Sequence, residues 1–182
     1  DGKRVFTKAS YSDVDPADDY AAAVEAVTEA GVMNGVGNGS FAPGATVTRA
    51  QVITTLGRLA GAVPTEVTAY TDVAPNSWYS GYVGWAVANS IVSASSGRFV
   101  PNGTMTGTEL DAILSAYAGV QGLDYINFPA HDNMSPAPVT RSVLAQRLVK
   151  LMNAPADYDY ADKEWASQTM IDYWAGRGVV EK

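Results

Sequence analysis

Two arginines occupy the same place in two similar stretches of the chain. Arg49 lies in Thr-Arg-Ala-Gln at 48–51 and Arg141 in Thr-Arg-Ser-Val at 140–143, and an apolar stripe with helical spacing follows each. A guanidinium can bind a carboxylate through two parallel hydrogen bonds, and free N–H groups at a helix start favour an anion. We therefore predict that both arginines bind an acidic ligand. The alternative is an ordinary surface salt bridge.

The tryptophans are candidates for stacking on a sugar ring, because an aromatic face offers apolar area to the C–H side of a pyranose. Trp85 and Trp174 lie at helical core spacing, so we predict that both are buried. Trp78 and Trp165 stand where helices are predicted to begin, and a groove can reach that position. These two are candidates for ligand binding and equally for the core.

Most catalytic and metal chemistry lacks the residues it needs. The chain has no cysteine and one histidine, His131, so a Cys-ligated zinc site, a thiol nucleophile and a Ser-His-Asp triad are not expected. Asp15, Asp18 and Asp19 suggest a calcium loop, but they lack the glycine and bidentate glutamate of an EF-hand and suit a helix start better. We expect no cofactor, no metal and no enzymatic activity.

Charge and hydropathy narrow the range of partners. A net charge of −7 argues against a nucleic-acid partner, which requires a basic face. It does not exclude an anionic polymer, because exposed charges are screened beyond roughly 8 Å at physiological salt. No run of about 18 apolar residues occurs, so we expect no membrane insertion.

The elements that position these residues form an internal repeat. Tyr-Ser-Asp-Val at 11–14 returns as Tyr-Thr-Asp-Val at 70–73, and a Phe-x-Pro segment that begins at Phe41 returns at Phe99. The boundaries that follow are a lead-in at 1–10, repeat 1 at 11–62 and repeat 2 at 70–119.

Each repeat is predicted to contain two helices joined by a turn. In repeat 1 the first helix carries Val24 and Val27 and stops at Gly31. Asn38-Gly39 predicts a tight turn, and its surroundings lack the lysine of a phosphate-binding loop.

The second helix of each repeat has a marked start. Thr48 and Gln51 have the spacing of a capping box, in which each side chain bonds the backbone N–H of the other residue. Thr106 and Glu109 repeat this pattern. Val143 holds the corresponding place after Thr140 and cannot complete a box.

The remaining chain contains the parts of a third repeat in a different order. Residues 125–152 include a second half, and residues 157–182 read as a first half with Asp159 at the place of Asp72. Three first halves and three second halves predict a pseudo-threefold assembly that closes within one chain, with repeat 3 at 120–182 in swapped order. The alternative is that residues 157–182 open a fourth, truncated unit.

These motifs resemble S-layer homology repeats. The resemblance rests on the two Tyr-x-Asp-Val openings, on Gly-Val-Met-Asn-Gly at 31–35, and on Phe-Ala-Pro before Thr-Arg-Ala-Gln, which is close to the family signature Thr-Arg-Ala-Glu. It implies a mainly α fold, a pseudo-threefold trimer of repeats with a central helix bundle and short loop or hairpin prongs. It also implies non-catalytic anchoring to a secondary cell-wall polymer, often a pyruvylated and therefore anionic polysaccharide. Other S-layer proteins are further expected partners, at an extracellular location on the bacterial cell wall.

The resemblance also assigns residues. Arg49 and Arg141 hold the signature arginine, which faces a groove and contacts the anionic sugar, whereas repeat 2 has Gly107 there and its groove is expected to be weaker. Asp13 and Asp72 are expected to brace their loops rather than act as acids. The complete set of ligand-binding candidates is Arg49, Arg141, Asp13, Asp72, Gln51, Glu109, Trp78 and Trp165. The alternative, motivated by Gly107 and Val143, is a structural protein–protein module of a surface layer with inactive grooves.

Overall fold

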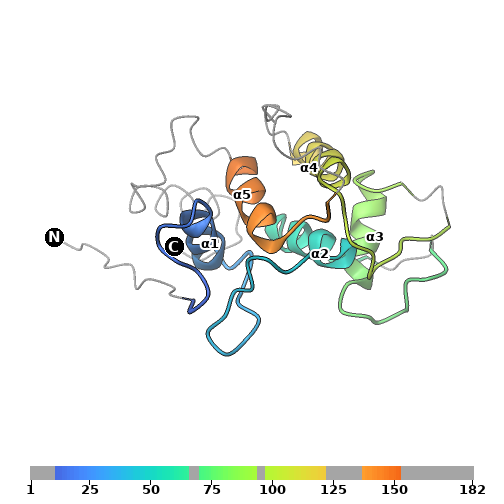
Figure 1. Ribbon diagram of the computed structural model, residues 1–182. Helices are drawn as coiled ribbons and strands as arrows, with labels where there is room; N and C mark the ends of the chain where they lie inside the picture. Colours follow the sequence, from blue (N-terminus) through green and yellow to red (C-terminus); the bar gives the residue numbers. More distant parts are fainter. Residues whose placement is uncertain (1–10, 66–69, 94–96, 122–136, 153–182) are drawn as a thin grey trace. The chain divides into compact units, whose positions relative to one another are not determined.

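The computed structural model describes residues 11–65, 70–93, 97–121 and 137–152 (Figure 1). They divide into two compact units: unit 1 joins residues 11–44 to 141–152, and unit 2 comprises the described residues of 45–140. Several predictions concern residues outside this part of the chain: His131, Asp159, Trp165, Trp174 and the first half at 157–182.

The described part of the chain is mainly α, as predicted. Its helices are α1 (Ala21–Glu29), α2 (Arg49–Leu59), α3 (Ser80–Ala88), α4 (Gly107–Gln121) and α5 (Arg141–Leu151). The antiparallel pairs within it are single bridges and not strands. None of these helices has both the length and the apolar character that crossing a membrane requires.

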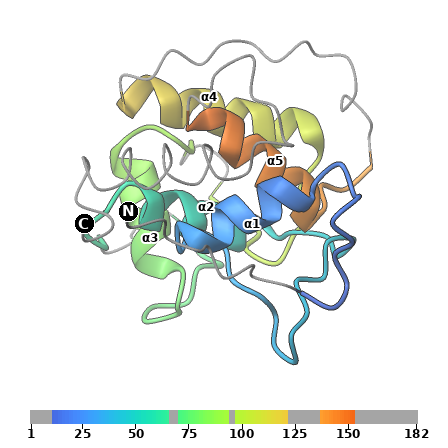
Figure 2. The same ribbon diagram turned by 90° about the vertical axis from the view of Figure 1, so that its left-hand side faces the viewer.

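In unit 1, helix α1 packs against α5, and the two lie side by side in both views (Figures 1 and 2). Val24 and Val27 from α1 and Leu144 and Leu148 from α5 are fully buried. Each such side chain contributes roughly 1.5–3 kcal/mol on burial. The apolar stripes predicted from helical spacing are therefore the faces that form this core.

Gly31 lies just past the end of helix α1, where the sequence predicts a helix stop. Gly31 has a φ of 66°, the left-handed conformation that glycine adopts without strain. The N–H of Val32 donates to the carbonyl of Val27 at 2.9 Å, and the N–H of Gly31 donates to that of Thr28 at 3.0 Å. This pair of bonds is a Schellman motif, which satisfies the last carbonyls of the helix.

The predicted turn at Asn38-Gly39 is also present in unit 1. Both residues have positive φ, 53° and 71°, as a type I′ turn requires. Gly37 and Ser40 form an antiparallel bridge, and the N–H of Ser40 donates to the carbonyl of Gly37 at 3.0 Å. The segment is a tight hairpin turn.

In unit 2, helix α2 packs closely against α3 because Gly57 of α2 has no side chain at the contact. A Cβ at Gly57 would overlap the ring of Tyr82, so only glycine allows this packing distance. Trp85 of α3 is 8% exposed and meets the ring of Tyr117 edge-on at 6.4 Å between centroids. The prediction that Trp85 belongs to the core is confirmed.

Both predicted capping boxes are formed. The N–H of Gln51 donates to the Thr48 hydroxyl at 3.3 Å, and the N–H of Thr48 donates to Oε1 of Gln51 at 2.9 Å. In α4, the N–H of Glu109 donates to the Thr106 hydroxyl at 3.3 Å, and the N–H of Thr106 donates to Oε2 of Glu109 at 2.8 Å. A neutral amide and a carboxylate thus make the same cap.

Three equivalent segments of unit 2 pair in a cycle. Each segment contributes the residue directly before its second helix, namely Thr48, Thr106 or Thr140, and the residue two positions earlier, namely Thr46, Thr104 or Pro138. The first residue of one segment pairs with the earlier residue of the next: Thr48 with Thr104, Thr106 with Pro138, and Thr140 with Thr46. The residues between the bridged positions, Val47, Met105 and Val139, are all buried. The N–H of Val47 donates to the carbonyl of Val139 at 2.9 Å, and that of Val139 donates to Met105 at 2.7 Å. The cycle relates these segments, and not whole repeats.

Alanine at two helical glycines is expected to change stability in opposite directions. Gly57→Ala places a methyl group in the ring of Tyr82, so the free energy of unfolding is expected to fall by roughly 1–3 kcal/mol. Gly119 of α4 has no described atom within 4 Å of a Cβ position. Gly119→Ala is therefore expected to raise that free energy by about 0.5–1 kcal/mol through helix propensity. Urea unfolding measures both, and equal effects of the two variants would contradict the packing described for Gly57.

Candidate functional site

The opening aspartate of each repeat holds the Phe-x-Pro segment in place. Asp72 accepts the N–H groups of Phe99 at 2.8 Å and of Val100 at 2.9 Å, and the bond from Phe99 is the main reason that the pKa of Asp72 lies below its usual value. Val100 has a φ of 56°, which is costly for a β-branched residue. The two bonds stabilise this strained turn.

Repeat 1 contains the same arrangement in unit 1. Asp13 accepts the hydroxyl of Ser40 and the N–H groups of Phe41 and Ala42, both at 2.8 Å. The Ser40 hydroxyl contributes most to lowering the pKa of Asp13. Ala42 has the same φ of 56° as Val100. The prediction that Asp13 and Asp72 brace their loops is confirmed.

The opening tyrosine of each repeat packs on the phenylalanine of the same segment. The ring centroids of Tyr11 and Phe41 are 5.3 Å apart, and those of Tyr70 and Phe99 are 5.5 Å apart, with nearly equal tilts. The hydroxyl of Tyr70 also donates to the carbonyl of Ser93 at 2.5 Å. Burial is the main reason that the pKa of Tyr70 is raised, so this tyrosine is a neutral donor.

The start of α2 is closed by backbone carbonyls that follow Phe99. The N–H of Arg49 donates to Gly103 at 2.9 Å, the N–H of Ala50 donates to Pro101 at 3.0 Å, and that of Gln51 is used in the capping box. The prediction that free N–H groups at this helix start bind an anion is therefore wrong. The guanidinium and the helix dipole are what α2 offers to a ligand.

The side chain of Arg49 lies across the Phe99 segment and reaches α4. Its Nη2 is 2.9 Å from Oε1 of Glu109, and its Nη1 makes longer contacts of 3.4 Å with the carbonyl oxygens of Phe99 and Val100. The side chain is 20% exposed and that of Glu109 is 45% exposed, so solvent reaches the ion pair. Arg49 is therefore neither buried nor free.

Glu109 is held from two directions. Its Oε2 accepts the N–H of Thr106 at 2.8 Å and the hydroxyl of Thr106 at 3.1 Å, while its Oε1 faces Arg49. The N–H of Thr106 is the largest cause of the lowered pKa of Glu109, to which Arg49 adds. The carboxylate is consequently charged at neutral pH.

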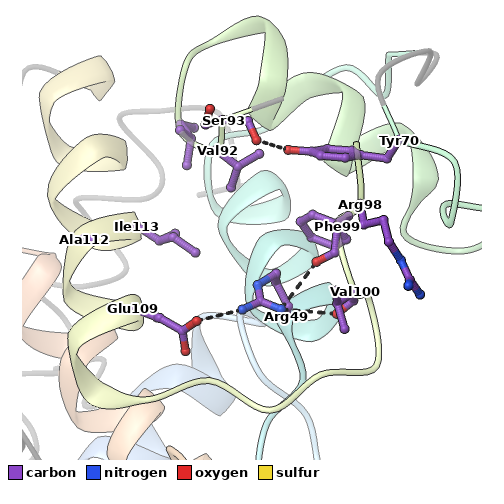
Figure 3. Close-up of a pocket in the computed structure, with 11 residues that line it drawn as sticks. Arg49, Tyr70, Val92, Ser93, Arg98, Phe99, Val100, Glu109, Ala112 and Ile113 are labelled. Carbon is purple, nitrogen blue, oxygen red and sulfur yellow. Dashed lines mark hydrogen bonds and ion pairs between the residues drawn. The ribbon is translucent and has the colours of Figure 1, made fainter. Parts of the chain in front are cut away.

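These residues line a cleft of about 460 Å³ in unit 2. Figure 3 shows Arg49 and Glu109 at one end, and Tyr70 with Ser93 at the other. The lining between these ends is mostly apolar and consists of Ile91, Val92, Phe99, Val100, Ala112 and Ile113, with Arg98 beside it. The volume and the few polar groups on apolar walls are typical of a small-ligand site.

Arg141 occupies the corresponding position in unit 1, but it is enclosed more tightly. Its Nε donates to the carbonyl of Phe41 at 2.8 Å, its Nη2 donates to that of Asn34 at 2.6 Å, and its guanidinium lies 4.5 Å from the centre of the Phe41 ring. Burial is the main cause of its lowered pKa. Two of its three nitrogens are thus committed to the loop.

Two of the other predicted ligand residues, Trp78 and Gln51, are not part of the cleft lining. Trp78 is 57% exposed and packs edge-on against Tyr79, with ring centroids 5.1 Å apart, and it is not among the residues that line the cleft. The Oε1 of Gln51 is occupied by the capping box. Trp165 lies outside the described residues.

Sequence reasoning missed several residues of this cleft. The repeat motif identifies Tyr70 but does not predict that this residue lines a cleft. It also does not predict the ion pair between Arg49 and Glu109. Arg98 is 71% exposed in its side chain, and its Nε lies 3.6 Å from Asp72. The recurrence of Tyr and Phe in both repeats is the signal that could have identified the aromatic wall.

Neutral substitutions of the opening aspartates are expected to destabilise the protein at neutral pH more than at acidic pH. Both residues have a usual pKa near 3.8 and a lower pKa in the folded protein. Their contribution is therefore complete above about pH 4 and is lost as the pH falls through the lower folded values. Asp13→Asn and Asp72→Asn should lower the Tm at pH 7, and the difference from wild type should shrink at pH 3.

Circular dichroism at the two pH values measures these midpoints. Asp19→Asn is the control, because the Asp19 carboxylate is exposed and makes no hydrogen bond that involves the described residues. A constant difference in Tm between wild type and either variant from pH 7 to pH 3 would show that the carboxylate charge is not what holds the loop.

Comparison with known protein families matches both repeats. Residues 10–53 and 69–110 match the model of the S-layer homology domain. A cell surface protein of Thermoanaerobacter kivui is 30% identical over 122 residues, which are 63% of this chain and 16% of that relative. S-layer homology domains are non-catalytic modules that associate proteins with the cell wall and surface. This chain therefore carries two S-layer homology domains, at residues 10–53 and 69–110.

Proposed function

We propose that this chain anchors its parent protein to the bacterial cell wall by binding an anionic secondary wall polysaccharide, without catalysis. The observation that carries the proposal is the cleft of unit 2, which presents the Arg49 guanidinium beside apolar walls in an S-layer homology domain. The guanidinium pairs with an acidic group of the glycan, such as a pyruvyl ketal, and the apolar lining receives the C–H face of a sugar.

The position of Arg49 supports a negatively charged ligand. The positive end of the α2 dipole disfavours a cation at the first helical residue, and α2 has no acidic residue in its first turn. An acidic sugar beside Arg49 offsets this unfavourable charge. A single cleft of this kind binds modestly, and several linked clefts add avidity.

We further propose that the three repeats close in a pseudo-threefold arrangement, with repeat 3 at 120–182 in swapped order. The cyclic bridges of unit 2 support it, because they join equivalent segments of the three second halves in one direction. The common geometry of Arg49 on Phe99 and Arg141 on Phe41 supports it as well. A crystal structure that places residues 157–182 outside such a ring would contradict it.

A second function is favoured by one observation. Arg49 is paired with Glu109, and Arg141 is bound to main-chain carbonyls, so neither arginine requires a ligand. A protein–protein module within a surface layer would contain arginines in this state. Sedimentation with purified S-layer protein, compared with polymer-bearing wall sacculi, separates the two functions.

Arg49→Ala is expected to weaken polymer binding by roughly 1–3 kcal/mol, because charge-assisted hydrogen bonds to the acidic sugar are lost. Isothermal titration with purified secondary wall polymer measures the affinity. Arg58→Ala is the matched control, since Arg58 lies in the last turn of the same helix and outside the cleft lining. Absence of wild-type binding at any salt concentration would refute the proposed function.

Arg141→Ala is expected to affect folding more than Arg49→Ala. Arg141 makes two short bonds to loop carbonyls, so its removal should reduce the free energy of unfolding by roughly 1–3 kcal/mol. The solvent-reached pair of Arg49 contributes at most about 1 kcal/mol. Urea unfolding of both variants measures the difference. The reverse order would show that the contacts of Arg49 stabilise the fold more than those of Arg141.

A further inference from the structure

The Arg49 cleft contains a permanent negative charge. A site that only has to hold an anion gains nothing from a carboxylate 2.9 Å from its guanidinium, because Glu109 competes with the ligand for Arg49 and repels it. Glu109 nevertheless lines the cleft, and its side chain is 45% exposed. A ligand in the cleft therefore meets both charges.

Rotation of the Glu109 side chain away from the cleft is unfavourable. Its Oε2 is engaged with the N–H and the hydroxyl of Thr106, so a rotation out of the cleft would break the cap of α4. The N–H of Thr106 would then lose its partner at the helix start, which is unfavourable. The cap therefore favours the observed position of the carboxylate, with Oε1 directed at Arg49 (Figure 3).

A fixed carboxylate beside a guanidinium recognises a pair of groups. An acid on the ligand takes the hydrogen bonds of Arg49, and Oε1 of Glu109 then requires a donor from the ligand. A sugar hydroxyl next to the acidic substituent supplies that donor, and a hydroxyl bound to a carboxylate forms a short, strong hydrogen bond. An anion without a donor leaves two negative groups facing each other.

We propose that Glu109 selects the ligand of this cleft: it admits an anionic sugar that carries a hydroxyl donor beside its acidic group, and it rejects an anion that has none. This inference rests on the proposed function in so far as the occupant is an anionic glycan. Tyr70 and Ser93, hydrogen-bonded to each other, leave the opposite end of the cleft without net charge. Arg98 also lines the cleft, but its Nε lies 3.6 Å from Asp72 and its side chain is 71% exposed. The two charges that face each other in the cleft are therefore those of Arg49 and Glu109.

The chain itself supplies the variant that tests this role without disturbing the cap. Gln51 holds the position of Glu109 in repeat 1, and its amide completes the same capping box. Glu109→Gln is therefore expected to keep α4 capped while it removes the charge. Asp19→Asn removes one exposed carboxylate from unit 1 and controls for the change in net charge.

The probes are methyl β-D-glucuronide, a sugar carboxylate with adjacent hydroxyls, and propionate, a carboxylate of equal charge with no hydroxyl. Titrations are followed through the NMR signals of the Phe99 and Val100 amides and of Arg49 Nε. Wild type is expected to prefer the glucuronide by about tenfold, since a charge-assisted bond replaces a repulsion. In Glu109→Gln this preference should fall to about threefold or less, chiefly because propionate binds better.

Arg49→Ala should abolish the response to both probes, and Asp19→Asn should leave the preference unchanged within about twofold, as expected of an exposed charge that does not line the cleft. An equal preference in wild type and Glu109→Gln, or no response of the cleft signals to either probe, overturns the inference. Sedimentation of wild type with polymer-bearing sacculi tests the proposed function separately. Wall binding with unchanged selectivity refutes only the role of Glu109, and selectivity without wall binding refutes only the anchoring function.

Discussion

The first backbone N–H groups of a helix have no partner within the helix. In this chain, the segments that bond these groups at the starts of α2 and α5 also position the two signature arginines. In unit 2 the carbonyls of Pro101 and Gly103 accept from the start of α2, and in unit 1 the carbonyl of Pro43 accepts from Ser142 of α5 at 3.0 Å. These carbonyls follow left-handed residues, Ala42 and Val100, in turns that aspartates hold by their N–H groups. Opening motif, turn and helix start thus form one continuous hydrogen-bonded connection.

The same connection explains why the arginines are where they are. A side chain that leaves the first residue of α2 or α5 passes over the Phe-x-Pro segment that caps that helix, and it meets the carbonyl of Phe99 or Phe41. The two units differ beyond that point. Arg141 has short bonds and a ring beneath it, whereas Arg49 has long carbonyl contacts and a carboxylate partner. An equivalent position therefore carries a mainly structural group in one unit and an accessible one in the other.

Features that depend on neighbours in the sequence were predictable. Gly31, the turn at Asn38-Gly39 and the box of Thr48 with Gln51 follow from local backbone chemistry, and all are present. The partners of Arg49 were not predictable, because they lie 50 to 60 residues away and belong to the other repeat. The prediction of free N–H groups at the start of α2 was wrong for the same reason. Their acceptors are the carbonyls of Pro101 and Gly103, which lie more than 50 residues away in the sequence.

The equivalence of Gln51 and Glu109 in capping has a consequence for how such a module diversifies. Duplicated segments drift apart only as far as folding permits, and most positions that shape a binding surface are constrained by packing. Here an amide and an acid serve the backbone equally well while they differ by a full unit of charge. The charge that faces Arg49 can therefore change at this position while the start of α4 stays capped.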